Sequence, residues 1–324
     1  MTPFRHFGVM GGGAVGCLYG GWLAKAGAQV SIVARPRHVD TITADGLRVS
    51  GRDFDFRVPV RASTDPASLA SCDVILFCTK TRDTEHAAAA LKPSLPASSV
   101  VLAFQNGVDG AERLAAVLSN PVFPAALFVS CHMEGPGHVR HNGRGDVVLG
   151  EWFSTRVDAA DRRAVLYSLA RMFTDASIPT SVSDDVRKVL WTKLAMNCGY
   201  NALSALGRAR YERLVAEESS ARMMKHIVDE LVIVGRADGV DLDRELVWRQ
   251  VFELANGMPR AISSTGQDIA AGRSTEIEDL NGYVVRRGEA RGIATPFNET
   301  MVRLIRILES APYDPAFFPN PSAS

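Results

Sequence analysis

A polar stripe along one predicted helix is the first feature of this sequence that could do chemistry. Lys193, Asn197 and Asn201 recur at four-residue spacing in the segment 190–201, which places them within about 80° of one another on one helix face. Ser204 falls between them. An ammonium group, two carboxamides and a hydroxyl can hold a carbonyl and a neighbouring hydroxyl while donating a proton. Asparagine is a weak helix former, so two asparagines on one face favour a functional role. An exposed polar face remains the alternative at this point.

A glycine-rich turn near the amino terminus could bind a pyrophosphate. It lies between an apolar segment and a helical pattern and matches G-x-G-x-x-G. The first glycine permits a tight turn, the second lets the backbone approach the phosphates, and the third lets helix and strand pack closely. The helix amino end adds free N–H groups and a partial positive charge. A plain flexible turn is the alternative, but the position in a strand–helix–strand unit favours dinucleotide binding. The turn consists of Gly11, Gly12, Gly13, Ala14, Val15 and Gly16.

The end of the second predicted strand, 29–34, indicates which dinucleotide is bound. An NAD enzyme usually has an acidic residue about 20 residues after the glycines, where it bonds the ribose hydroxyls. This chain has Arg35 and Arg37 there and no acidic residue until Asp40. Guanidinium groups suit a 2′-phosphate, so we expect NADP (NADPH) with Arg35 as a ligand. Two solvated surface arginines are the alternative.

Two further polar residues follow predicted strands of the same half. Lys80 follows the strand 74–78, and Asn106 follows the strand 100–104. Open α/β sheets bind ligands at the carboxyl ends of their strands, so both residues are candidates for binding. A solvated lysine and an ordinary Asn-Gly turn are the alternatives.

Two residues of the second half have local explanations as strong as functional ones. We expect Glu276 to open a helix capped by Thr275, with Glu278 completing a capping box. Because the helix dipole already favours an acid there, capping accounts for Glu276 nearly as well as catalysis does. Ser264 lies in a polar segment and reads, on its own, as a turn serine.

Composition limits the class of protein. Thirty-six basic residues balance 36 acidic ones in 324 residues, which gives no electrostatic reason to expect nucleic acid or an anionic membrane as partner. The five cysteines form no C-x-x-C pair, which argues against a disulfide framework or a zinc site and fits a reducing compartment. The sequence has neither the pattern of a secretory signal nor an apolar run of membrane-spanning length. We therefore expect a cytoplasmic protein with a small-molecule partner.

The elements that must position these residues differ between the two halves. Apolar strand-type runs alternate with helical patterns up to about residue 120, which predicts an α/β fold with a doubly wound parallel sheet. Short strands follow to residue 150, with a turn inside 138–150 that would hold His138 and His141 as turn or surface residues. Beyond residue 184 the pattern is almost entirely helical. We place two domains at 1–183 and 184–324.

Eight motifs in this order resemble the ketopantoate reductases (2-dehydropantoate 2-reductases), over residues 7 to about 309. Individually most are weak, but jointly they are specific for that family. They are GGGAVG at 11–16, VARPRH at 33–38, CTK at 78–80, QNGV at 105–108, W-x-K-L-x-x-N-x-x-x-N at 191–201, SSTGQDI at 263–269, GRSTEIEDLNG at 272–282 and GIATPFNET at 292–300.

The resemblance implies a Rossmann domain followed by an all-helical domain, with substrate and nicotinamide in the cleft between them. It implies hydride transfer from NADPH to the C2 carbonyl of ketopantoate, giving pantoate for the pantothenate route to coenzyme A. The resemblance also implies a role for each candidate residue. Lys193 is the catalytic lysine that polarises the carbonyl and protonates the alkoxide, Asn197 and Asn201 bind the substrate, and Ser264 holds its carboxylate end. Glu276 completes the site and touches the cofactor, Asn106 lies where nicotinamide and substrate meet, and Lys80 lies near the cofactor.

Four positions depart from the family pattern and leave the identity of the 2-oxo acid open. Ala202 replaces a usual proline, Ala261 a frequent asparagine, and Thr265-Gly266 a larger apolar pair. A reductase of another small 2-oxo acid is therefore one alternative, and a non-catalytic NADP(H) sensor is another. A sensor would need only the glycine turn and Arg35. The sequence leaves the oligomeric state open, and a homodimer is compatible with it.

Overall fold

The computed structural model describes residues 4–152 and 159–310. The chain divides into two compact units, Met1–Leu190 and Trp191–Ser324. The division falls within one helix, α6 (Val186–Leu206). The assignment of residues 1–183 and 184–324 to separate domains stays a prediction.

The first unit alternates strands with helices, as the sequence pattern predicts. Short 3-10 helices lie at Pro66–Leu69 and Thr81–Asp83. The other elements are β1 (His6–Met10), α1 (Ala14–Lys25), β2 (Gln29–Val33), α2 (Pro36–Asp45), β3 (Leu47–Ser50), β4 (Asp55–Val58), β5 (Arg61–Ser63), β6 (Val74–Phe77), α3 (Thr84–Leu91), β7 (Val100–Ala103), α4 (Gly110–Val117), β8 (Val122–Gly135), β9 (His138–Gly150), α5 (Ala159–Asp175) and β10 (Thr180–Ser183).

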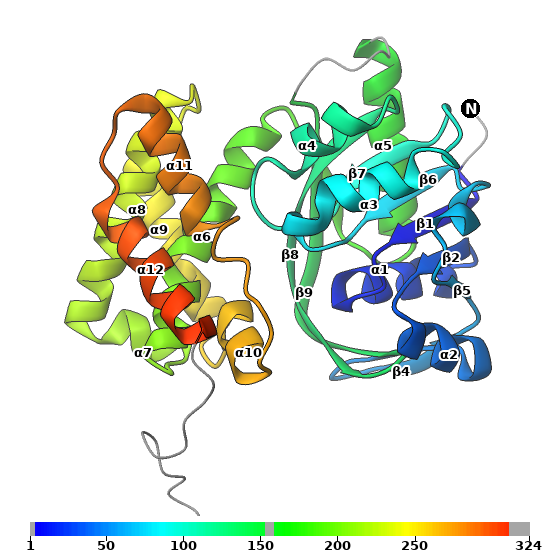
Figure 1. The fold of residues 1–324 in the computed structure, drawn as a ribbon, viewed down its shortest axis with the longest axis horizontal. Coiled ribbons are helices and arrows are strands. Elements are labelled where there is room, and N and C mark those ends of the chain that lie inside the picture. Colours follow the sequence, from blue (N-terminus) through cyan, green and yellow to red (C-terminus); the bar gives the residue numbers. More distant parts are fainter. Residues whose placement is uncertain (1–3, 153–158, 311–324) are drawn as a thin grey trace, which may run out of the picture. The chain divides into compact units, whose positions relative to one another are not determined.

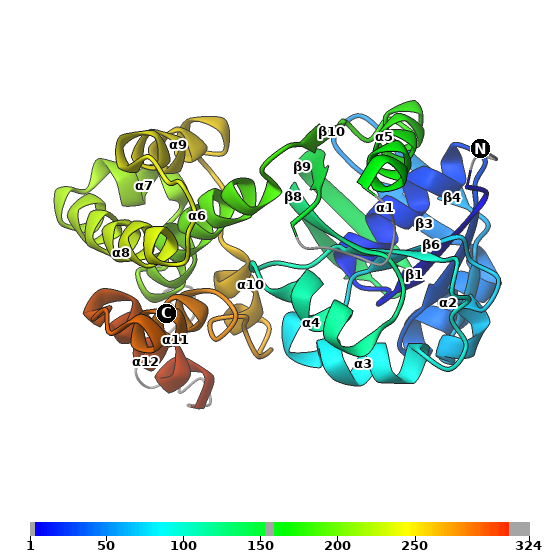
Figure 2. The ribbon, with the colours of Figure 1, turned by 90° about the horizontal axis from the view of Figure 1, so that it is seen from above.

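The strands of the described residues form one mostly parallel sheet in the order β4-β3-β9-β8-β7-β6-β1-β2-β5, with β10 beside β9. The pairs β3–β4 and β8–β9 are antiparallel. Helices lie on both faces of the sheet, with α1 and α5 on one side and α3 and α4 on the other (Figures 1 and 2). This arrangement confirms the predicted Rossmann-type α/β fold.

Alternate residues of the central strands supply two separate cores. In β6, Val74 and Leu76 pack in the core that includes residues of α1 and α5, whereas Ile75 and Phe77 pack in the core that includes residues of α3 and α4. Successive strand side chains point to opposite faces. A strand covered on both faces is therefore apolar at every position, which explains the unbroken Val-Ile-Leu-Phe run.

The sheet curls around α1. This helix contacts β1 and β2, and it also contacts β3, β8 and β9 from the distant half of the sheet. Its residues 16–23 are buried. Gly21 permits the approach of β3, because a Cβ at that position would collide with Val49. The helix that follows the glycine turn is therefore held on several sides.

The segment 138–150 is one continuous strand, so the turn predicted inside it is wrong. The β8–β9 turn lies at residues 136–137, and Gly143, Arg144 and Gly145 instead have positive φ values of 153°, 57° and 144°. The ladder shifts register beside these residues, which is how β-bulges absorb extra residues without ending a strand. The two histidines are not turn residues: His138 Nε2 lies 2.8 Å from Ser50 Oγ, and His141 stacks on Phe54.

The regular elements in residues 191–310 are all helices, joined by turns and irregular segments, which confirms the predicted all-helical part. None of the helices in the described ranges combines the length and apolar character that a membrane span requires. After α6 come α7 (Tyr211–Ala216), α8 (Glu218–Ala237), α9 (Arg244–Gly257), α10 (Ser264–Ala270), α11 (Asn281–Arg291) and α12 (Pro296–Ser310).

Buried polar side chains lock the helices of the second unit together. The Glu230 carboxylate of α8 accepts hydrogen bonds from the backbone N–H groups of Phe297 and Asn298, both at 2.9 Å, and so caps α12. Asn281 Nδ2 donates to Asn298 Oδ1 at 3.0 Å and to the Cys198 carbonyl of α6 at 3.4 Å. The turn of α6 between Asn197 and Asn201 is therefore tied to α11 and α12.

Candidate active site

The glycine turn is held by its own backbone. The N–H groups of Gly11 and Gly12 both donate to the Val33 carbonyl, at 3.1 and 2.8 Å, and the N–H of Gly13 donates to the Gly11 carbonyl at 2.9 Å. Gly11 has a φ of 109°, a conformation that L side chains rarely adopt. The turn between β1 and α1 is thus anchored to the carboxyl end of β2.

The glycines of the turn differ in what surrounds them. A Cβ added to Gly12 would lie 2.6 Å from Ala34 Cβ, and one added to Gly16 would lie 2.3 Å from the Gly11 carbonyl oxygen and 2.6 Å from Val9 Cγ1. A Cβ added to Gly13 would meet nothing within 4 Å. Packing explains Gly12 and Gly16, whereas the open side of the turn is at Gly13, where a pyrophosphate would need room. The residues present fit a dinucleotide phosphate.

The start of α1 also fits an anion. Among the described residues no side chain caps this helix, and its first turn contains no acidic residue. The first N–H groups of a helix have no partner within the helix. Together with the helix dipole, they make the helix amino end a site for phosphate.

Arg35 and Arg37 form an exposed positive region at the end of β2. Arg35 is the N-cap residue of α2, whose first turn contains no acidic residue. His38 is buried beside them: burial, with the charges of Arg37 and Arg35, lowers the pKa of its imidazole below the ordinary value. Neutral His38 accepts a hydrogen bond from the Gly137 N–H at 3.3 Å. The free positive charge at this strand end therefore belongs to the two arginines.

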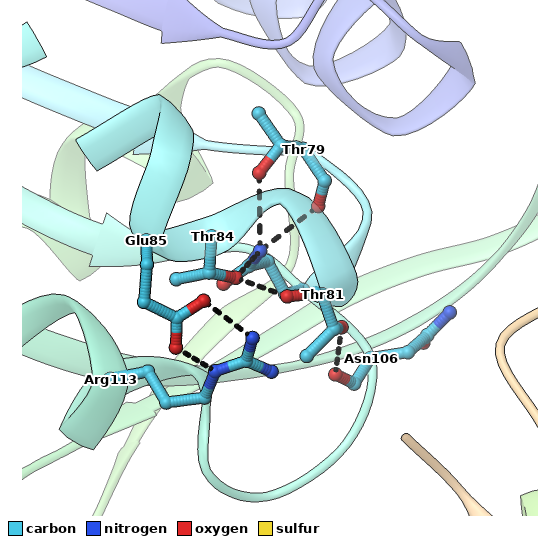
Figure 3. Close-up of polar contacts among 7 residues, drawn as sticks. Thr79, Thr81, Thr84, Glu85, Asn106 and Arg113 are labelled. Atoms are coloured by element: carbon cyan, nitrogen blue, oxygen red, sulfur yellow. Dashed lines mark hydrogen bonds and ion pairs between the residues drawn. The ribbon is translucent and has the colours of Figure 1, made fainter. Parts of the chain in front are cut away.

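Lys80 and Asn106, both half-buried, lie on two segments that the structure joins directly. Thr81 Oγ1 donates a hydrogen bond to the Asn106 carbonyl at 3.0 Å (Figure 3). A shallow surface hollow lies beside Asn106 and is also lined by Gln105, Gly110 and Pro124. The structure thus brings both predicted residues to the carboxyl-terminal edge of the sheet, the edge at which open α/β sheets bind ligands. The described residues contain no cluster of His, Cys, Asp or Glu placed to hold a metal ion.

The polar stripe of α6 is partly accessible. Lys193 and Asn197 are half-buried, whereas Asn201 is buried. Asn201 Nδ2 donates to Ser264 Oγ at 3.4 Å, and Ser263 Oγ donates to the Asn201 carbonyl at 3.0 Å. The structure therefore brings together Asn201 and Ser264, which are far apart in sequence.

Ser204, although on the same helix, has a structural role. Its Oγ donates to the Ala209 carbonyl at 2.8 Å and accepts from the Ser263 N–H at 3.3 Å. It thereby fixes the segment before α10. Ser264 is exposed and opens α10, so it is not a turn serine, and Ser263 caps that helix by accepting from the Gly266 N–H at 3.0 Å.

The helix and capping box predicted around Glu276 are wrong. The helix α11 begins at Asn281, and the Glu276 carbonyl accepts from the Asp279 and Leu280 N–H groups, at 3.0 and 3.1 Å, within a turn. Glu278 forms an ion pair with Arg306 at 2.5 Å instead of completing a box. The buried contacts of Asn281 fix the helix start at that residue. Helix capping therefore does not explain an acid at 276.

The departures from the family pattern lie close to the Asn201–Ser264 contact in sequence. Ala202 and Thr265 are buried, and Ala261 and Gly266 are half-buried. A Cβ on Gly266 would lie 3.3 Å from Ser263 Oγ and would crowd the cap of α10. Gly266 thus leaves room for the cap of the helix that Ser264 opens.

Known proteins resemble this chain over nearly its full length. Residues 7–153 match the family model of the ketopantoate reductase PanE/ApbA, and residues 185–309 match the model of its C-terminal part. A 2-dehydropantoate 2-reductase of Halobacterium salinarum is 33% identical over 308 residues, which are 93% of this chain and 98% of that protein. A second relative with that name, from Caulobacter vibrioides, is 31% identical over 302 residues, which are 92% of this chain and 97% of that protein.

Solved structures agree with these matches. The crystal structure of a PanE/ApbA family ketopantoate reductase from Ralstonia eutropha JMP134 has a TM-score of 0.85 and 44% identity, and the match covers 94% of this chain and 98% of that one. D-mandelate dehydrogenase, solved with NADH and anilino(oxo)acetate, has a TM-score of 0.87 at 21% identity, and the match covers 94% of this chain and 98% of that one. At that identity the likeness shows the fold alone.

These matches confirm the family predicted from the motifs. The relatives are NAD(P)-dependent oxidoreductases that act on a small keto acid, which disfavours a non-catalytic sensor. The protein is an enzyme, an oxidoreductase, and its chain belongs to the ketopantoate reductase family PanE/ApbA.

Proposed function

We propose that this enzyme reduces the C2 carbonyl of ketopantoate to pantoate with NADPH. The observation that carries the proposal is the contact of Ser264 with Asn201, which lies on the same helix as Lys193 and Asn197. It gathers a proton donor, carboxamides and a hydroxyl in one unit. The names of the relatives supply the substrate class.

Each side chain has a role that its chemistry supports. Bound NADPH supplies the hydride. The Lys193 ammonium stabilises the negative charge that develops on the carbonyl oxygen and donates the proton. Ser264 anchors the carboxylate, and Asn197 with Asn201 holds the far end of the substrate. Glu276 accepts a hydrogen bond from the substrate hydroxyl and also touches the cofactor.

The first unit holds the cofactor in this proposal. The residues of the glycine turn, 11–16, bind the pyrophosphate, and Arg35 binds the 2′-phosphate that distinguishes NADPH from NADH. Lys80 and Asn106 bind nearer the nicotinamide, and Asn106 also contacts the substrate. The exposed guanidinium groups and the open space at Gly13 support this assignment.

The remaining assignments follow from the same proposal. Residues 1–183 form the NADP-binding domain, and residues 184–324 form the substrate-binding and catalytic domain. The reaction serves pantothenate and coenzyme A biosynthesis in the cytoplasm.

The test is an NADPH oxidation assay with a panel of 2-oxo acids. The panel contains ketopantoate, 2-oxoisovalerate, which lacks the hydroxymethyl group, and phenylglyoxylate, the oxo acid that corresponds to mandelate. A site built to bond the hydroxyl should favour ketopantoate over 2-oxoisovalerate by at least about tenfold in kcat/KM. Parity, or a preference for the bulkier acid, would make the protein a reductase of another 2-oxo acid.

A further inference from the structure

A ring of hydrogen bonds joins the carboxyl ends of β6 and β7 (Figure 3). Gln105 Nε2 donates to Thr84 Oγ1 at 2.9 Å, and Thr84 Oγ1 donates to the Thr81 carbonyl at 2.7 Å. Thr81 Oγ1 then donates to the carbonyl of Asn106 at 3.0 Å. The series of hydrogen bonds thus begins at Gln105 and ends at its neighbour Asn106.

The orientation of the Gln105 amide is fixed. Its Nε2 also donates to the Thr79 carbonyl at 3.0 Å. A carbonyl only accepts, so the nitrogen of the amide must face Thr79. Thr79 and Thr81 are the immediate neighbours of Lys80 in the sequence. Gln105 bonds Thr79 directly and is linked to Thr81 through the Thr84 hydroxyl.

The ring is inside the protein. Thr81 and Thr84 have no exposed surface, and Gln105 is 7% exposed. Water does not replace a lost partner at such positions, and a donor or acceptor left alone is costly. The ring therefore has a strong preference for one arrangement of the two strand ends.

A second connection, between the helices α3 and α4 that follow these two strand ends, lies at the surface. Arg113 of α4 makes two hydrogen bonds to Glu85 of α3, at 2.6 and 2.7 Å (Figure 3). The Glu85 side chain is 52% exposed, and exposed ion pairs stabilise little. The buried ring is thus the stronger link between the segments that carry Lys80 and Asn106.

We propose that Thr81, Thr84 and Gln105 are positioning residues that hold Asn106 in register with Lys80 for the reduction. The inference rests on the proposed function of Asn106 and Lys80 as ligands of cofactor and substrate. Thr81 acts through the backbone of Asn106, since its hydroxyl bonds the carbonyl of that residue. A displacement of about 1 Å in a reacting site can lower the rate about a hundredfold.

The same two strands offer a matched control at their amino ends. Ser99 Oγ, just before β7, donates to the carbonyl of Cys72, just before β6, at 2.7 Å, and Ser99 is 1% exposed. Like the Thr81–Asn106 bond, this bond joins a buried hydroxyl to a backbone carbonyl, but it lies at the edge of the sheet opposite the predicted ligands. Ser99→Ala therefore reports the cost of losing such a bond without moving Asn106.

The experiment compares Thr81→Val, Thr81→Ser and Ser99→Ala in the full-length enzyme. Amide hydrogen exchange of residues 105–108 measures the placement of the Asn106 segment, and kcat/KM for the best 2-oxo acid of the panel measures the consequence. Thr81→Val should speed exchange there and lower kcat/KM by about tenfold to a hundredfold, while Thr81→Ser restores both. Ser99→Ala should leave both near the wild-type values at a comparable loss of thermal stability.

Two results would overturn the inference: equal effects of Thr81→Val and Ser99→Ala, or faster exchange at 105–108 with unchanged kcat/KM. Thr84→Val breaks the ring at another link, should repeat the Thr81→Val result, and replaces that variant if it does not fold. A wild-type enzyme that reduces no acid of the panel would refute the proposed function separately. In that case, unchanged exchange in Thr81→Val would still refute the positioning role.

Discussion

The glycine turn of the first unit and the α6 stripe of the second are built from different materials. The turn offers backbone N–H groups and empty space, and its shape depends on residues that lack a Cβ. The stripe offers an ammonium and two carboxamides on a regular helix. A substitution in the turn therefore acts through shape, whereas a substitution in the stripe acts through chemistry.

The two regions also differ in how much the stability of the fold depends on their residues. Gly12 and Gly16 are in contact with the sheet, so the fold needs them whether or not a ligand is bound. In the second unit, other residues hold the framework: Glu230, Asn281 and Asn298 are buried and bonded to one another's helices. We expect folding and function to be separable in α6 but coupled at most positions of the turn.

The largest effect should come from Lys193→Ala, which removes the proposed proton donor and the positive charge proposed to stabilise the carbonyl oxygen. We expect kcat to fall by about 10²–10⁴-fold, with little change in the dissociation constant of NADPH or in Tm. Steady-state kinetics, a fluorescence titration and thermal unfolding measure the three quantities. A variant with most of its turnover would reduce the stripe to a binding surface and remove the contrast with the turn.

Arg35→Ala tests the exposed charge beside the turn. One charge-assisted contact to phosphate stabilises by about 1.5–3 kcal/mol, or roughly 10- to 150-fold in preference for NADPH over NADH. The variant should lose that preference through weaker NADPH binding while its kcat/KM with NADH stays unchanged. Equal efficiency of the wild type with both cofactors would contradict the assignment of Arg35.

The pair Gly13→Ala and Gly16→Ala tests which glycine of the turn is needed for cofactor binding and which is needed for stability. Gly13 has an ordinary φ of −86° and open space around it, so alanine fits there without strain. We expect Gly13→Ala to keep its Tm and to weaken NADPH binding, whereas Gly16→Ala should lose about 1–3 kcal/mol of stability by overpacking. Thermal unfolding and a fluorescence titration of both variants decide this, and equal Tm values would refute the distinction.

The smallest effect concerns the framework of the second unit and depends on pH. Burial alone would raise the pKa of Asp238, but hydrogen bonds from Arg287 and Arg291 more than offset it and hold the pKa below the ordinary value of an aspartate. A depressed folded-state pKa stabilises the protein fully above about pH 4, and this contribution is lost as the pH falls through the folded-state pKa. Asp238→Asn should therefore lower Tm by a few degrees at pH 7 without changing kcat, and the difference in Tm should shrink at acid pH. A constant difference in Tm would rule out the titration of Asp238 as its source.

Local constraints explain what the sequence could predict. The glycine turn was predictable because each glycine answers a steric demand of its immediate neighbours. The stripe was predictable because a helix repeats regularly, and three polar residues at that spacing must share a face. Both predictions depend only on residues that are close together in the sequence.

Long-range contacts explain what it could not. Asn-Gly-Arg-Gly reads as a turn locally, but pairing with β8 keeps the segment in one strand and converts the glycines into bulges. Ser-Thr-Glu-Ile-Glu reads as a helix start, but the contacts of Asn281 with Asn298 and Cys198 delay the helix. No local pattern predicts the bonds of Thr81 and Gln105 to each other's segments, since these bonds join residues more than 20 positions apart.

The pairing of β3 has a consequence for the order in which the chain can fold. Its antiparallel neighbour β4 follows at once, but its other neighbour is β9, about ninety residues later. An isolated two-stranded hairpin is marginally stable in water, and contacts this distant along the chain form slowly. During synthesis, the β3–β4 hairpin therefore cannot pair with the rest of the sheet until β9 has left the ribosome. The enclosure of α1 is accordingly a late event in folding, completed only after the glycine turn and its first strands have been made.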